Sequence, residues 1–201
     1  MSEIHYAPQG AEAGTARRAM IESQLRTSGV NEPWVLSAIA AVAREDFIPA
    51  DHRAHAYIDR AIPLGNGRFA TPPLYTGKAL GVAEPVKGDK ALVVTAGSNY
   101  LAEVLRSLVG SLDTVDAADA AKGVAGSGYT LVIVDGAAGE VPQTLVDAMA
   151  EGGRIVTGLF NKSVSRLAIG RKTGGAVSFL PLAEMGIPAI PDFAAPKGWS
   201  F

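Results

Sequence analysis

Apolar and polar residues in the first third of the chain recur with a helical period. Across residues 13–28 apolar side chains repeat every three to four positions, with charged side chains on the opposite face. This pattern predicts a helix that ends at Gly29, a common C-terminal cap residue. A second helix is predicted over residues 32–42, with Asn31 as its N-cap and Pro33 in its first turn. The N-terminal part of the chain is therefore predicted to be helical.

Beyond Pro73 the pattern changes to short, wholly apolar runs that alternate with helical segments. Such runs are typical of strands buried on both faces of a parallel sheet. The predicted strands are residues 91–94, 112–116, 130–135 and 154–159. The predicted helices are residues 74–82, 100–109 and 142–150. Residues 166–182 then show a hairpin pattern around Thr173-Gly174-Gly175. We therefore expect an α/β fold, a doubly wound parallel sheet with an antiparallel C-terminal hairpin.

Length and composition limit the classes of protein to consider. The 201 residues predict one domain, with an N-terminal segment at 1–73, a sheet core at 74–185 and a tail at 186–201. A formal charge of -2 gives no electrostatic reason to expect nucleic acid or an anionic membrane as partner. The N-terminus is polar and no apolar run approaches the roughly 18 residues of a membrane span, which predicts a cytoplasmic location.

Metal and thiol chemistry are not expected. The chain contains no cysteine, which excludes disulfides and thiolate ligands. The three histidines, His5, His52 and His55, are not accompanied by carboxylates at ligand spacing, so we predict no metal site.

Three polar positions follow predicted strands on the side of the sheet where ligands bind in such folds. The strand at 91–94 leads into the loop Thr95-Ala96-Gly97-Ser98-Asn99. This loop is interpreted either as a cofactor loop or as a plain strand-to-helix turn. Asp116 lies about twenty residues on, where a carboxylate would hold ribose hydroxyls, or it is a solvated strand end or helix N-cap. Asp135 contacts a ligand or, more ordinarily, serves as a helix cap or turn acid.

Four stretches of sequence carry a resemblance to a known family. They are residues 20–26 with 35–49, residues 57–67, residues 86–89 with 92–100, and residues 140–142 with 151–154. In order and spacing they resemble the protein-L-isoaspartate O-methyltransferase family over about residues 16–185. The tail is similar to that of a divergent bacterial branch. The resemblance implies a Rossmann-like class I methyltransferase sheet and S-adenosylmethionine as cofactor. It also implies methylation of a carboxylate on a damaged peptide or protein.

The resemblance also assigns site residues. Thr71 stands where the family has a serine and Arg68 where it has a glutamine, so both are candidate catalytic residues. Thr71 would hydrogen-bond the acceptor and Arg68 would attract it, unless Arg68 is an ordinary surface arginine. The cofactor-binding candidates are Thr95, Ala96, Gly97, Ser98, Asp116 and Asp135.

The chain departs from the family pattern in ways that predict weak or lost cofactor binding. Val93 replaces the acid of the cofactor loop, while Thr95 and Asn99 replace glycines. Only residues 117–128 separate the second and third predicted strands, whereas a helix, a strand and their loops need at least roughly twenty residues. The family's third strand is therefore expected to be absent, and with it one wall of the adenine pocket. The alternative function is an inactive relative that serves as a binding or scaffolding module.

Overall fold

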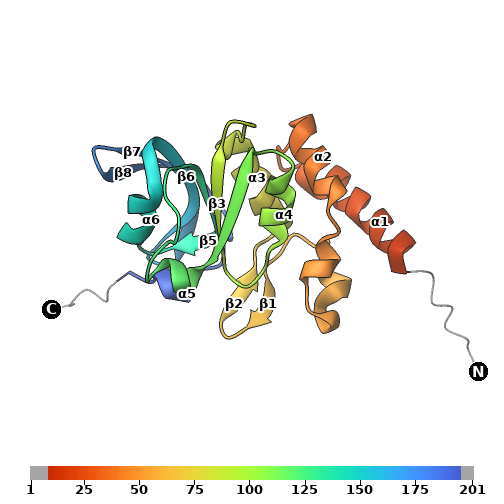
Figure 1. Ribbon diagram of the computed structural model, residues 1–201. Coiled ribbons are helices and arrows are strands. Elements are labelled where there is room, and N and C mark those ends of the chain that lie inside the picture. The colour runs from red at the N-terminus through yellow and green to blue at the C-terminus, as the bar shows by residue number, and fades with distance from the viewer. Residues whose placement is uncertain (1–8, 196–201) are drawn as a thin grey trace, which may run out of the picture.

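A six-stranded sheet organises the chain, with helices on both of its faces (Figure 1). The computed structural model describes residues 9–195. The strands are β3 (Lys90–Thr95), β4 (Ser111–Asp116), β5 (Tyr129–Ala138), β6 (Met149–Asn161), β7 (Val164–Thr173) and β8 (Ala176–Glu184). Their order is β4-β3-β5-β6-β7-β8, in which the first four are parallel and β7 and β8 are antiparallel to their neighbours. The predicted doubly wound sheet with an antiparallel hairpin is confirmed.

The sheet ends at β4, as the short connection after Asp116 predicted. Residues 117–128 contain one helical turn, α5 (Ala117–Ala120), before the chain enters β5. Among the described residues no strand pairs with the outer edge of β4. The absence of the family's third strand is therefore confirmed in the topology.

The helices divide into two groups, one on each face of the sheet. They are α1 (Gln9–Met20), continued by a π-helical turn (Ile21–Leu25), α2 (Pro33–Ala41), α3 (Pro73–Ala83), α4 (Tyr100–Arg106) and α6 (Gln143–Ala148). Two short 3₁₀ helices, Arg44–Phe47 and Ala50–His55, follow α2. Alternate side chains of β3 serve the two faces: Val93 packs in the core with α1 to α4, whereas Leu92 and Val94 pack in the core with α5 and α6.

Some predicted element ends were wrong by a few residues. The N-cap of α2 is Glu32, not Asn31, and Pro33 is the first helical residue. The helix predicted at 100–109 ends at Arg106, and the strands at 130–135 and 154–159 are longer than their apolar runs. Most of the extra strand residues are polar or small, so hydrophobic periodicity does not reveal them; Tyr129, Met149 and Phe160 are the exceptions.

A two-stranded hairpin precedes the sheet and was not predicted as strands. Its strands are β1 (Ile62–Gly65) and β2 (Arg68–Ala70), joined by a tight turn in which Asn66 adopts a positive φ of 52°. The side chains of Ile62 and Ala70 are buried, and Phe69 lies on the outer side with 37% exposure. The hairpin projects beyond the lower end of the sheet in Figure 1.

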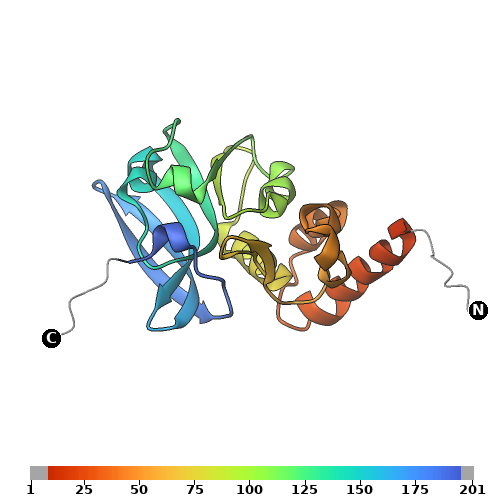
Figure 2. The ribbon, with the colours of Figure 1, turned by 90° about the horizontal axis from the view of Figure 1, so that it is seen from below.

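The C-terminal part of the described chain, residues 186–195, crosses the carboxyl end of β5, and we call it the strap. Figure 2, seen from below, looks onto this end of the molecule. The amide of Ala137 donates to the carbonyl of Pro188, and the amide of Ile190 donates back to Ala137, both at 2.8 Å. Gly136 makes this approach possible, because a Cβ there would lie 2.6 Å from Cγ1 of Ile190. The strap therefore covers the edge at which the polar candidates gather. Within residues 9–195 no helix combines the length and apolarity that a membrane span requires.

Candidate functional site

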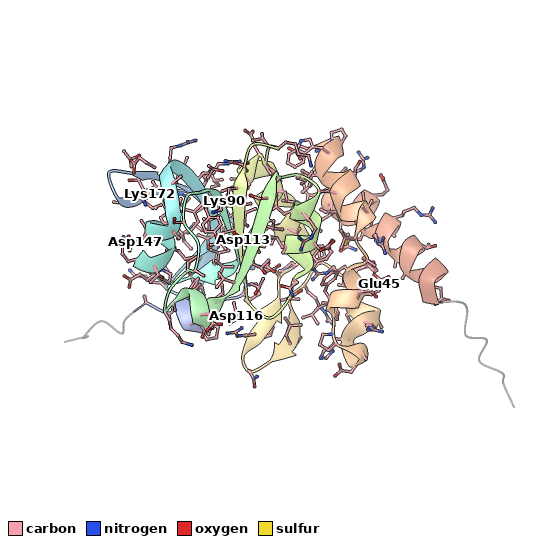
Figure 3. The ribbon with its side chains drawn as sticks, in the orientation of Figure 1. Glu45, Lys90, Asp113, Asp116, Asp147 and Lys172 are labelled. Atoms are coloured by element: carbon pink, nitrogen blue, oxygen red, sulfur yellow. The ribbon has the colours of Figure 1, made fainter. Side chains whose placement is uncertain are left out.

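The candidate residues converge at the carboxyl ends of β3, β4 and β5. Asp116 ends β4 and lies at the lower end of the sheet, between α5 and the β1–β2 hairpin (Figure 3). The loop from Thr95 to Asn99 follows β3, and Asp135 lies within β5. Parallel strands bring these positions to one edge, as their place in the sequence predicted.

The loop after β3 is closely packed. Thr95, Ala96 and Ser98 are all buried, and the Ser98 hydroxyl accepts a hydrogen bond from the Tyr100 amide at 3.3 Å. Gly97 has a φ of +101°, in the region that favours glycine. Thr95 and Asn99 do not need that conformation, since Thr95 has no positive φ and Asn99 has a φ of -97°. Replacing the family's glycines at these two positions is therefore compatible with the loop's backbone.

The hairpin lies directly on this loop. A Cβ on Gly97 would lie 3.2 Å from Cδ1 of Leu64 and 3.7 Å from Cδ of Arg68. Leu64 and Gly97 line both of two neighbouring hollows. One, of about 500 Å³, is lined by Leu64, Gly65, Asn66, Arg68, Gly97, Pro191 and Asp192. The other, of about 380 Å³, is lined by Asp46, Phe47, Ile48, Pro49, Leu64, Gly97, Ser98 and Asn99. The hairpin and the loop after β3 thus both contribute to the walls of these two hollows.

Arg68 extends from the hairpin to the carboxylate that ends β4. Its guanidinium donates to both carboxylate oxygens of Asp116, with Nη2 to Oδ1 at 2.9 Å. The same Nη2 donates to Oδ2 of Asp192 in the strap at 2.9 Å. The hydrogen bonds that Arg68 donates to Asp116 lower the pKa of Asp116 and raise the pKa of Arg68. Arg68 is therefore a partner of two carboxylates and not a free surface arginine.

Asp116 also performs the structural role that was its alternative interpretation. Its Oδ1 accepts a hydrogen bond from the amide of Ala118 at 3.0 Å and so caps α5. Of the two interpretations of Asp116, the helix N-cap is therefore confirmed, and its role in holding ribose hydroxyls stays a prediction.

Thr71 and Asp135 form a second, separate pair. The Thr71 hydroxyl donates to Oδ1 of Asp135 at 2.6 Å, and Thr71 and Asp135 are 2% and 4% exposed. The prediction that Asp135 is a helix cap or turn acid was wrong, because it lies inside β5. Burial raises the pKa of Asp135 to about 6, against the opposing effects of the Thr71 hydrogen bond and the nearby Arg44. The two candidate catalytic residues, Thr71 and Arg68, therefore have different partners.

Arg44 was missed by sequence analysis. It is 1% exposed, and it donates from Nε to the carbonyl of Ala56 at 2.8 Å and from Nη2 to that of Thr71 at 2.7 Å. Its guanidinium carbon lies 4.8 Å from the centroid of the Tyr100 ring. Arg44 therefore fixes the backbone of Thr71. An arginine beside Glu45 and Asp46 has the pattern of an exposed charged turn, so no signal marked it.

The raised pKa of Asp135 makes stability depend on pH. The folded state binds the carboxyl proton of Asp135 more tightly than the unfolded chain does, because in the unfolded chain this carboxyl has its ordinary pKa of 3.8. The group's stabilising effect is therefore full below that value and is lost as pH rises through about 6. The free energy of unfolding falls by about 3 kcal/mol over this range.

We expect Asp135→Asn to remove this pH dependence of stability, measured by denaturant unfolding between pH 3.8 and about 6. Asp51→Asn, at an exposed carboxyl, is the control. An unchanged pH profile in Asp135→Asn would contradict the prediction.

Comparison with known proteins places the chain in a family. A family model described as Protein-L-isoaspartate(D-aspartate) O-methyltransferase (PCMT) matches residues 15–125, more than half of the chain. The chain belongs to this family. A protein-L-isoaspartate O-methyltransferase from Aeropyrum pernix is 33% identical over 216 residues, which cover 92% of this chain and 83% of the relative. One from Methanoregula boonei is 27% identical over 83% of this chain and 92% of its own length. The family that the sequence resembles is therefore confirmed as the family of this chain.

Solved structures support the same fold. A putative PCMT-family methyltransferase from Plasmodium falciparum, crystallised with S-adenosyl-L-homocysteine, superposes with a TM-score of 0.67 at 16% identity. That match covers 88% of this chain and 98% of the other. A second protein-L-isoaspartate O-methyltransferase structure gives a TM-score of 0.69 at 18% identity and covers 86% of this chain and 65% of the other. The predicted Rossmann-like methyltransferase fold is therefore confirmed.

PCMT-family membership implies chemistry that depends on S-adenosylmethionine, but the residues of the cleft do not fit that cofactor as they are arranged here. Asp116, which would take the ribose hydroxyls, is bound by Arg68. Val93 is wholly buried and provides no acid to the loop. Leu64 lies so close to Gly97 that a Cβ there would be 3.2 Å from its Cδ1, which narrows the space along the loop.

The sequence also predicted that no metal is bound. Among the described residues, no group of three or more potential ligand side chains is arranged to hold a metal ion. His5 lies outside the described residues, and the prediction that no metal is bound stays a prediction.

Proposed function

We propose that this chain is a non-catalytic member of the PCMT family, a binding module whose cofactor cleft is closed by its own side chains. The observation that carries the proposal is the pairing of Arg68 with Asp116. A carboxylate at the end of the second strand binds ribose through its two oxygens. Both oxygens of Asp116 already accept hydrogen bonds from the Arg68 guanidinium. Two neutral hydroxyls would have to replace these stronger, charge-assisted hydrogen bonds, which costs free energy.

The candidate acceptor site supports the same proposal. A hydroxyl that positions a substrate carboxylate must point into the cleft, yet the Thr71 hydroxyl donates to Asp135 inside the protein. Thr71 has one hydroxyl proton to donate, and Asp135 takes it. Neither hollow beside Gly97 is lined by Thr71 or Asp135. Each residue expected to bind the acceptor is thus hydrogen-bonded to one expected to bind the cofactor: Arg68 to Asp116, and Thr71 to Asp135.

A second candidate function is the one the relatives are named for, methylation of an isoaspartyl carboxylate on a peptide or protein. Identities of 27% and 33% over most of the chain favour it. Under this candidate S-adenosylmethionine is the methyl donor, and Thr71 and Arg68 act on the acceptor after the cleft has rearranged. Either candidate has a polypeptide as partner and a cytoplasmic location, both of which stay predictions.

Titration with S-adenosylhomocysteine distinguishes the two candidates. We expect the unmodified chain to give neither heat in calorimetry nor a shift in melting temperature at millimolar ligand, because a ligand that binds only the folded state must stabilise it. Clear binding, followed by transfer of a labelled methyl group to an isoaspartyl peptide, would establish the second candidate. Binding without transfer would also contradict the closed cleft and would point to a different acceptor.

A further inference from the structure

The contact of Arg68 with Asp116 and Asp192 joins three regions that are far apart in the sequence. Arg68 lies on the hairpin, Asp116 ends β4, and Asp192 belongs to the strap, so the arginine is 48 and 124 residues from its partners. We call the Arg68 side chain the plug. All three side chains lie at the same end of the sheet as the hollow of about 500 Å³, which Arg68 and Asp192 help to line.

The plug presents the chemistry of a bound diol. Two nitrogens of the Arg68 guanidinium donate to the two carboxylate oxygens of Asp116, as two neighbouring hydroxyls of a ribose would. The guanidinium therefore competes with a nucleoside for the same acceptor atoms. The guanidinium is held by ionic contacts, and the side chains of Arg68, Asp116 and Asp192 are 20%, 37% and 26% exposed. Partly exposed ion pairs are weakened by salt, so the plug can be displaced.

The strap covers the end of the sheet beside β4. Ile190 and Phe193 are each 2% exposed and belong to the same core cluster as Ala117 and Ala120 of α5, so they anchor the strap and do not face the hollow. The strap residue that lines the hollow with Asp192 and Arg68 is Pro191, and Leu64 of the hairpin lines it too. Displacing Arg68 would therefore leave the Asp116 carboxylate beside a hollow with apolar lining from Pro191 and Leu64, a combination that is usual in small-molecule sites.

We infer that Arg68 is an autoinhibitory side chain that masks a latent nucleoside site formed by Asp116 and the strap. This inference rests on the proposed function and adds to it that the closure is ionic, local and reversible. Displacing one guanidinium, by substitution or by salt, exposes the carboxylate without unfolding the strap or the sheet.

The test compares four proteins by calorimetric titration with S-adenosylhomocysteine and with adenosine. Arg68→Gln removes the plug and keeps a side chain of similar length. Asp192→Asn weakens the hold on Arg68 but leaves its contact with Asp116. Arg166→Gln is the matched control, because Arg166 forms an exposed ion pair with Glu184 away from the plug. Circular dichroism and thermal melting establish that each variant is folded.

We expect Arg68→Gln to bind either ligand at least about tenfold more tightly than the unmodified chain, a ratio worth about 1.4 kcal/mol. Asp192→Asn should change affinity in the same direction by less, and Arg166→Gln should behave as the unmodified chain does. Added sodium chloride should bring binding by the unmodified chain into the measurable range and should not strengthen binding by Arg68→Gln. A purely structural role for Arg68 would not produce that salt dependence.

The outcomes separate this inference from the proposed function. A folded Arg68→Gln that binds no better than the unmodified chain would overturn the inference and leave the proposed function standing. Tight binding by the unmodified chain would overturn the proposed function. In that case an Arg68→Gln affinity equal to that of the unmodified chain would also overturn the plug, whereas a further tenfold gain would support it.

Discussion

Arg44→Ala is expected to lower the free energy of unfolding by about 3–5 kcal/mol, the range of large buried truncations. Arg44 is the largest fully buried side chain of the described residues. Its loss would leave a cavity against the Tyr100 ring and would leave the carbonyls of Ala56 and Thr71 without their charged donor. Burial also lowers the pKa of Arg44, so part of the loss is offset by no longer holding a cation out of water. Denaturant unfolding measures the net result.

Two further substitutions divide this effect into its causes. Arg44→Met refills most of the volume without a donor, so the difference between Arg44→Met and Arg44→Ala reports the cavity. Arg53→Ala, at an exposed arginine of the neighbouring 3₁₀ helix, is the control and should cost less than about 0.5 kcal/mol. Arg44 also lowers the pKa of Asp135, so Arg44→Ala and Asp135→Asn should couple in a double-mutant cycle. A cost below about 1 kcal/mol for Arg44→Ala would contradict the prediction.

The arrangement of the sheet could be predicted because its determinants are local or countable. The run Leu92-Val93-Val94 is apolar at every position, and each of its residues is buried, as expected of a strand covered on both faces. The missing third strand followed from the number of residues in 117–128, which is a limit set by chain length. The hairpin at residues 62–70 escaped prediction because its strands are only four and three residues long and contain a proline.

The position of the candidate site could be predicted from the sequence, but the pairing of its side chains with one another could not. Strand order and the place of Asp116 located correctly the edge of the sheet at which the candidate residues gather. The sequence does not show that Arg68 binds Asp116, because the two residues are 48 positions apart. The second partner of Arg68, Asp192 of the strap, is 124 positions away. No periodicity encodes such pairs. The same holds for Thr71 and Asp135, whose contact spans 64 residues and consumes the hydroxyl that the resemblance assigned to the acceptor.

Phe193→Ala is the other substitution from which we expect a large effect, a loss of about 3–5 kcal/mol in the free energy of unfolding. Phe193 is 2% exposed and packs in the core cluster on the α5 and α6 face of the sheet. The helical turn that carries it, residues Pro191–Phe193, is only three residues long and has little stability of its own. The strap is therefore held by this ring and by the backbone hydrogen bonds of its neighbours.

Phe160→Ala is the matched control, since the Phe160 ring is 37% exposed and its removal should cost less than about 1 kcal/mol. Hydrogen exchange tests whether the loss acts through the strap. The amides of Gly139 and Glu140 donate to the carbonyl of Phe193, so in Phe193→Ala they should exchange faster than amides of β3. Equal stability of Phe193→Ala and the unmodified chain would show that the strap is not a structural wall. A strap anchored by the Phe193 ring would explain how this end of the sheet stays covered although the third strand is absent.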